Sequence, residues 1–128
     1  MSSSASDPTS STTLQYVHWF RHSAPYINAH RGKTFVLMFD GEAVQHDNFQ
    51  HIIHDIALLH SLGIRLILVH GARPQINQQL KVAQIETPFY KQRRITTRES
   101  LTAVMSAVGS IRLQIEALLS MGLANSPM

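Results

Sequence analysis

Two short stretches carry residues that could hold an anionic ligand, because each directly follows an apolar run that favours a strand. The stretches are Asp40-Gly41-Glu42, after the run 34–39, and His70-Gly71-Ala72-Arg73-Pro74, after the run 64–69. At the ends of parallel strands in an α/β sheet, unpaired backbone amides and helix dipoles converge. We therefore expect the two stretches to lie on one edge of a sheet and to face one crevice. A plain turn at each position is the alternative interpretation.

Arginine and histidine side chains are the other candidates for chemistry. Arg93 and Arg94 could clamp a carboxylate or a phosphate with their forked donors, or could belong to an ordinary surface loop. His46, His51 and His54 fall on one predicted helix, opposite its apolar stripe, so a solvated face is favoured over a metal site. The chain has no cysteine, and no serine pairs with a histidine in a hydrolase-like pattern. We expect no catalytic group and no metal in this chain.

A strand–helix–strand unit would position these residues. The apolar runs 34–39 and 64–69 are continuous, which predicts two strands buried on both faces. Between them, apolar residues at helical spacing predict an amphipathic helix over 44–61, with Gly63 just past its end. The unit should be a right-handed βαβ crossover. Pro74 suits the first turn of a following helix that reaches about residue 84.

Further elements are expected on either side of this unit. A helix should run from Leu14 to Ala24 and end at Pro25, since proline disfavours helical geometry in the residue before it. The sequence of residues 86–95 predicts a hairpin-like extended stretch. Thr96 to Glu99 are expected to form a capping box for a long final helix. The apolar stripe of that helix is expected in the core: Leu101, Val104, Met105, Val108, Ile111, Ile115, Leu118 and Leu119.

Composition bounds the class of protein. With 128 residues, 44% of them hydrophobic, the chain fits one domain of ordinary size. Its net charge of +3 is scattered, and no aromatic residues interleave with a basic run, so nucleic-acid binding is not expected. No apolar run approaches the roughly 20 residues of a membrane span, and the Ser/Thr-rich start is no secretory signal. We expect a disordered tail over 1–13, one domain over 14–128, no membrane partner and a cytoplasmic location.

Several segments, taken in order, resemble bacterial N-acetylglutamate synthases and arginine-sensitive acetylglutamate kinases. The resemblance rests on Ala24 to Val36, Leu58 to Arg65, Val69 to Ile76 and Arg94-Ile95-Thr96, and it extends from about Leu14 to Met128. It implies an α/β, amino-acid-kinase-like three-layer fold with a mainly parallel sheet. Only two sure strands can be counted where such a sheet needs about five. The domain is therefore expected to be truncated.

Departures from the kinase pattern favour the synthase branch. Acetylglutamate kinases carry a Lys-x-Gly-Gly strand end and a His-Gly-Gly-Gly loop. Here Met38 stands at the lysine position, Asp40 at the first glycine, and Ala72 and Arg73 at the second and third loop glycines. Phosphoryl transfer relies on a cation and on closely approaching backbone amides, so it is not expected here. The resemblance implies vestigial ligand loops, made of Asp40, Gly41, His70, Gly71, Ala72, Arg73 and Arg94.

The synthase branch implies a glutamate N-acetyltransferase of arginine biosynthesis. Its C-terminal acetyltransferase domain, which this chain is expected to lack, transfers acetyl from acetyl-CoA to the amino group of L-glutamate. This chain would be part of the arginine-sensing domain, with no cofactor of its own. L-arginine would act as feedback inhibitor, Tyr26 would contribute to the effector site, and subunits would form a homo-oligomer. An acetylglutamate kinase fragment and a non-catalytic small-molecule-binding module are the alternatives.

Overall fold

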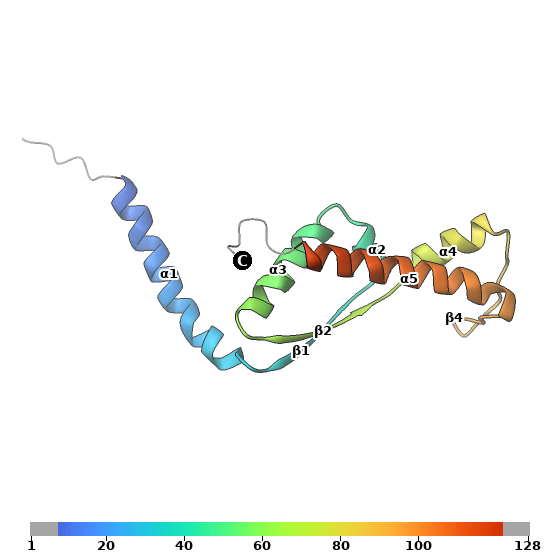
Figure 1. Ribbon diagram of the computed structural model, residues 1–128, viewed down its shortest axis with the longest axis horizontal. Helices are drawn as coiled ribbons and strands as arrows, with labels where there is room; N and C mark the ends of the chain where they lie inside the picture. The colour runs from blue at the N-terminus through green and yellow to red at the C-terminus, as the bar shows by residue number, and fades with distance from the viewer. Residues whose placement is uncertain (1–7, 122–128) are drawn as a thin grey trace, which may run out of the picture.

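The centre of the molecule is a βαβ unit (Figure 1). The computed structural model describes residues 8–121. Strands β1 (Thr34–Phe39) and β2 (Arg65–His70) pair in parallel, in register from Thr34 opposite Arg65 to Phe39 opposite His70. The α/β class and both predicted strands are confirmed.

The connection between the strands is two helices rather than the single helix expected over 44–61. Helix α2 (Gly41–Gln45) begins directly after β1, because the Asp40 carboxylate caps it by accepting from Ala43 N at 2.9 Å. The chain then turns extended at His46, and α3 (Phe49–Ser61) follows. Gly63, at φ +90°, sits just past α3 as expected, in a conformation that favours glycine.

The elements after β2 follow the predicted order. Helix α4 (Arg73–Val82) carries Pro74 in its first turn, and β3 (Phe89–Tyr90) pairs antiparallel with β4 (Arg93–Arg94). Both expectations are confirmed. The capping box of α5 (Arg98–Ser120) lies one residue later than expected: Thr97 and Ser100 exchange hydrogen bonds between side chain and backbone. Because Thr97 rather than Thr96 is the N-cap, Ser100 takes the third helical position, where its buried hydroxyl accepts from Thr97 N.

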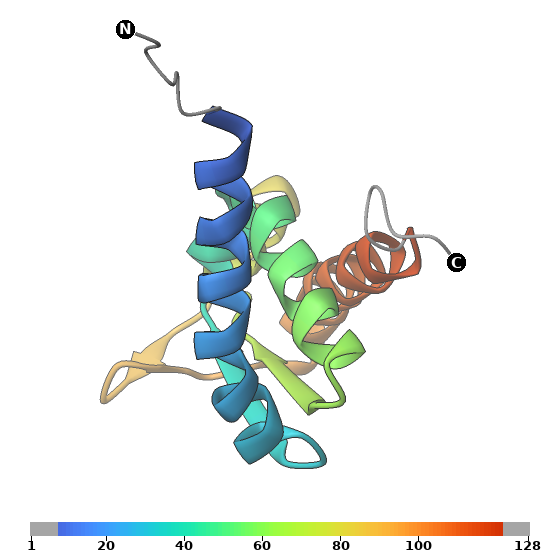
Figure 2. The same ribbon diagram turned by 90° about the vertical axis from the view of Figure 1, so that its left-hand side faces the viewer.

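The core lies between the sheet and the helices on one of its faces. Figures 1 and 2 show α3 and α5 on the same side of β1 and β2. The buried cluster of the core consists of Val44, Phe49, Ile53, Ile56, Ala72, Ile111 and Ile115. Leu37, Phe39, Leu66 and Leu68 of the strands pack against this cluster. The opposite sheet face is exposed through Val36, Met38, Ile67 and Val69. The expectation of strands buried on both faces is therefore wrong for the described residues, because no helix in that part of the chain covers the second face.

Helix α5 buries a narrower stripe than expected. Ala107, Ile111 and Ile115 are buried, whereas Leu101 is exposed and Met105 is 65% exposed. The reason is that α5 packs on α4 and α3 along one face only. Within residues 8–121, α5 is also long and apolar enough to cross a membrane by length and composition. The buried face of α5, with Ile111 and Ile115, belongs to the core cluster, and most of the rest of the helix is exposed.

Helix α1 (Pro8–His30) stands away from the rest of the molecule and meets it at the start of β1 (Figure 1). It begins within the predicted tail and continues through Pro25, so both expected ends are wrong. Proline removes one backbone donor and crowds the preceding turn, but α1 still closes beyond it, with Arg31 N donating to Ile27 O at 2.9 Å. Residues 1–7 of the predicted tail lie outside the described residues.

Candidate functional site

The loops after β1 and β2 lie against each other at one edge of the sheet, as expected. We call the loop residues Asp40, Gly41, His70, Gly71, Ala72 and Arg73 the strand-end site. Gly71 N donates to Phe39 O at 2.8 Å. A Cβ atom on Gly71 would lie 3.1 Å from Gly41 N and 3.2 Å from Asp40 Cα. Only a glycine permits this approach without displacing the neighbouring backbone.

The side chain of Gln75 closes the space between the two loops. Gln75 Nε2 donates to Gly41 O at 2.7 Å, and a Cβ atom on Gly41 would meet Gln75 Oε1 at 2.5 Å and Pro74 Cδ at 2.7 Å. Gln75 Oε1 itself is buried and accepts no hydrogen bond within the described part of the chain. The start of α4 therefore packs directly onto the start of α2, just after β1, where an open crevice was expected.

The charged and apolar groups of the strand-end site serve the fold. The Asp40 carboxylate is engaged as the N-cap of α2, where a negative charge is favoured by the helix dipole. Ala72 is buried in the core, and Met38 is 81% exposed on the uncovered sheet face. The end of β1 thus carries an anion and an apolar side chain, whereas phosphoryl transfer calls for a cation. His70 Nδ1 lies 3.2 Å from Gly71 O, a local contact within the loop.

Arg73 and Arg94 share a hollow beside the strand-end site. The hollow has a volume of about 310 Å³ and is lined also by Ile76, Phe89 and Val104. The Arg94 guanidinium donates to Thr87 Oγ1 and Asn77 Oδ1 and lies 4.7 Å from the centre of the Phe89 ring. These contacts hold its planar fork in place. Arg93 also lines the hollow, and three arginines beside apolar side chains suit a small carboxylate or phosphate ligand.

Tyr26 lies far from these loops. It is on α1 and is 70% exposed. Helix α1 joins the amino end of β1, whereas the strand-end site is at the carboxyl end, and a strand of six residues spans about 20 Å. The structure does not bring Tyr26 together with the other predicted site residues, so any role it has belongs to a second site.

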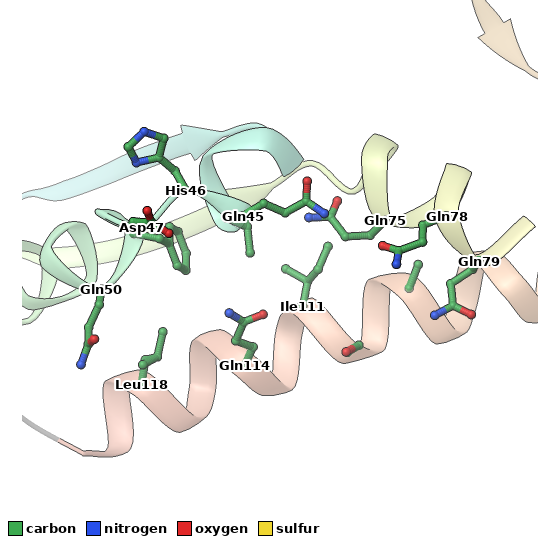
Figure 3. Close-up of a pocket in the computed structure, with 14 residues that line it drawn as sticks. Gln45, His46, Asp47, Gln50, Gln75, Gln78, Gln79, Ile111, Gln114 and Leu118 are labelled. Atoms are coloured by element: carbon green, nitrogen blue, oxygen red, sulfur yellow. The ribbon is translucent and has the colours of Figure 1, made fainter. Parts of the chain in front are cut away.

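A pocket rich in glutamine was not singled out from the sequence. It has a volume of about 570 Å³ and lies between the α2–α3 junction, α4 and α5 (Figure 3). Its polar lining includes Gln45, His46, Asp47, Gln50, Gln75, Gln78, Gln79 and Gln114. The signal in the sequence was the helical spacing of Gln75, Gln78 and Gln79, but the other members come from distant elements. Carboxamides both donate and accept hydrogen bonds and Asp47 adds a carboxylate, so this lining suits a polar group that donates hydrogen bonds.

Within residues 8–121, no group of three or more histidine or carboxylate side chains gathers to hold a metal ion. His51 and His54 of the predicted polar face lie with ring centres 6.4 Å apart.

A parallel βαβ unit with ligand-type loops at its carboxyl edge defines a class of α/β proteins that bind small molecules at strand ends. The sequence pattern of the Amino acid kinase family matches residues 33–128, which include both strands, both loops and α5. The chain belongs to the amino acid kinase family.

Relatives and solved structures point to one branch of that family. The amino-acid acetyltransferase of Azotobacter vinelandii is 56% identical over 113 residues, covering 88% of this chain and 26% of the relative. The Pseudomonas syringae pv. tomato enzyme of the same name is 54% identical over 114 residues, 89% of this chain and 26% of the relative. The chain thus spans about a quarter of the length of these relatives.

The solved structures come from Neisseria gonorrhoeae. Its N-acetylglutamate synthase with coenzyme A and L-arginine matches with a TM-score of 0.71 and 33% identity, covering 88% of this chain and 27% of that one. The complex with coenzyme A and N-acetyl-glutamate matches with a TM-score of 0.70 over 82% of this chain and 25% of that one, again at 33% identity. The amino-acid-kinase-like fold predicted from the sequence is confirmed.

Proposed function

We propose that this chain is the front part of the arginine-sensing domain of a cytoplasmic glutamate N-acetyltransferase. The observation that carries the proposal is the identity of 56% to an amino-acid acetyltransferase, which extends over 88% of the chain. The strand-end site agrees with it, because Met38, Asp40 and the closed contact between Gln75 and Gly41 are unsuited to phosphoryl transfer. The kinase-like fold would then serve regulation.

The proposed enzyme joins acetyl-CoA and L-glutamate. The amino group of glutamate attacks the acetyl carbonyl, the coenzyme A thiolate leaves with a proton, and N-acetyl-L-glutamate results. We assign this chemistry to the remaining three quarters of the relatives' length, so no catalytic residue is assigned to this chain. Asp40, Gly41, His70, Gly71, Ala72, Arg73 and Arg94 are proposed as remnants of a kinase ligand site.

The effector is proposed to be L-arginine, with α1 contributing to its site. A synthase of similar fold has been solved with L-arginine, and the exposed Tyr26 ring offers a flat apolar surface and a hydroxyl. Such a side chain can cover the aliphatic part of arginine and hydrogen-bond to one of its polar ends. The exposed apolar residues of α1, Leu14, Tyr16, Val17, Trp19 and Phe20, are proposed to contact another subunit of a homo-oligomer.

A chimeric enzyme tests the proposal. In the Azotobacter vinelandii relative, the 113 matched residues are replaced by those of this chain. The chimera is then supplied with acetyl-CoA and L-glutamate, and the release of free coenzyme A is measured. We expect glutamate-dependent release that L-arginine suppresses, with the unmodified relative measured alongside as reference. If L-arginine inhibited the unmodified relative but not the chimera, the proposed arginine-sensing role of this chain would be contradicted. If the chimera instead catalysed phosphorylation of N-acetylglutamate by ATP, the kinase alternative would be supported.

A further inference from the structure

We propose that His18 and His22 on α1 form a binding site for a divalent transition-metal ion of the zinc class. The two residues are four apart, so they lie one helical turn from each other on the same face. Their Nε2 atoms are 3.1 Å apart, their ring centres 4.3 Å apart, and the rings are tilted by 51°. Both side chains are exposed, so an ion reaches the two nitrogens directly from solvent.

The separation of the two nitrogens matches what a shared ion requires. With Zn–N bonds of about 2.0–2.1 Å, two ligands at a tetrahedral angle are about 3.3 Å apart, and two at a right angle about 2.9 Å. The observed 3.1 Å lies between these values and corresponds to an angle of about 98° at the ion. The separation of the two nitrogens is therefore compatible with one ion shared between them.

The competing account of this contact is a hydrogen bond between two neutral rings, in which one Nε2 donates and the other accepts. That account needs a proton on one Nε2, whereas a shared ion needs both Nε2 atoms free and both protons on Nδ1. No third histidine or acidic side chain in residues 8–121 joins the pair. Two protein ligands leave the remaining positions of a tetrahedral ion to water.

The other histidines of the described region are arranged differently. His51 and His54 are three residues apart on α3, and their ring centres are 6.4 Å apart with the rings nearly perpendicular. His46 Nδ1 accepts from Asn48 N, and His60 Nδ1 lies 3.3 Å from Ile64 O. These differences make His51 a matched control: it is exposed, helical and one turn from another histidine, but its pair is too widely spaced.

Calorimetric titration of the complete 128-residue chain with Zn²⁺ tests the site. We expect one Zn²⁺ to bind per chain and no comparable binding of Mg²⁺, which prefers oxygen ligands. His22→Ala should weaken this binding tenfold or more, and His51→Ala should leave it unchanged. Alanine is the best helix former, so a loss of binding in His22→Ala reports the missing ligand, and circular dichroism verifies that helicity is kept.

A composition-matched variant and a second measurement sharpen the test. The double variant His22→Ser, Ser23→His keeps all eight histidines of the chain. It moves one imidazole to a position about 100° further around the helix. This variant should lose the site as His22→Ala does. In NMR spectra, substoichiometric Co²⁺ should broaden the ring signals of His18 and His22 before those of the other histidines. Absence of Zn²⁺ binding, equal affinity in the exchanged variant, or uniform broadening of all the rings would each overturn the proposal.

Discussion

The side chains around the strand-end site make many contacts within the chain, whereas the large side chains of helix α1 make few. At the strand-end site, Gln75 fills the space at Gly41 and Asp40 caps α2, and in the hollow beside it Arg94 is held by Thr87 and Asn77. Helix α1 presents Trp19, Phe20 and Tyr26 to solvent. The loops proposed as remnants of a kinase site are thus packed against their neighbours, while the helix proposed to contribute to the effector site exposes apolar surface.

The largest expected effect concerns the close contact at Gly41. Gly41→Ala places a methyl group 2.5 Å from Gln75 Oε1 and 2.7 Å from Pro74 Cδ, so the helix start must shift. We expect a loss of about 1–3 kcal/mol in the free energy of unfolding, measured by urea denaturation. Gly109→Ala is the matched control, because nothing lies within 4 Å of its added methyl group, and it should stabilise α5 by about 0.5–1 kcal/mol. An unchanged stability of Gly41→Ala would show that the site is looser than described.

Helix α1 should tolerate substitution but control association. We expect the chain to associate in solution, since α1 and one sheet face expose large apolar side chains. Trp19→Ala combined with Phe20→Ala should shift sedimentation toward the monomer. The free energy of unfolding should change by less than about 0.5 kcal/mol, because both rings contact mainly solvent. A marked loss of stability with association unchanged would instead place these rings against the chain's own domain.

The smallest expected effect belongs to the surface ion pair of α5. Arg112 Nε donates to Glu116 Oε1 at 2.8 Å, and this hydrogen bond and the charge of Glu116 raise the pKa of Arg112. A raised pKa favours the folded state at every pH below the ordinary value for arginine, so the contribution fades only under strongly alkaline conditions. Glu116→Gln should therefore leave the melting temperature almost unchanged near neutral pH, because exposed pairs contribute little. A clear fall in melting temperature would show that α5 depends on this pair.

Local signals allowed much of the fold to be predicted from the sequence. The apolar runs of β1 and β2, Gly63 after α3 and Pro74 at the start of α4 each act through neighbouring residues, and each was placed correctly. The break at His46 was missed because it depends on Asp40 capping a new helix directly after β1. The capping box was misplaced by one residue because Thr96 and Thr97 are both suitable N-caps by residue type, and the structure uses Thr97 with Ser100.

The candidate site was predictable in position but not in detail. Parallel strands bring the loops at Asp40 and His70 to one edge whatever their composition, so their proximity followed from the strand pattern. The closure by Gln75 could not be inferred, because it depends on how α4 packs against Gly41. The glutamine pocket likewise combines side chains from α2, α4 and α5 that no local pattern connects.

Arginine inhibition of the chimeric acetyltransferase tests the contrast between the two regions most directly. With Tyr26→Ala, the arginine concentration for half inhibition should rise about tenfold or more, equivalent to about 1.4 kcal/mol, while turnover of glutamate is largely kept. Arg73→Ala, a change in the strand-end site at an exposed residue, should leave that concentration unchanged. The opposite pattern, with arginine inhibition insensitive to Tyr26→Ala and relieved by Arg73→Ala, would place the effector at the strand-end site and contradict the account.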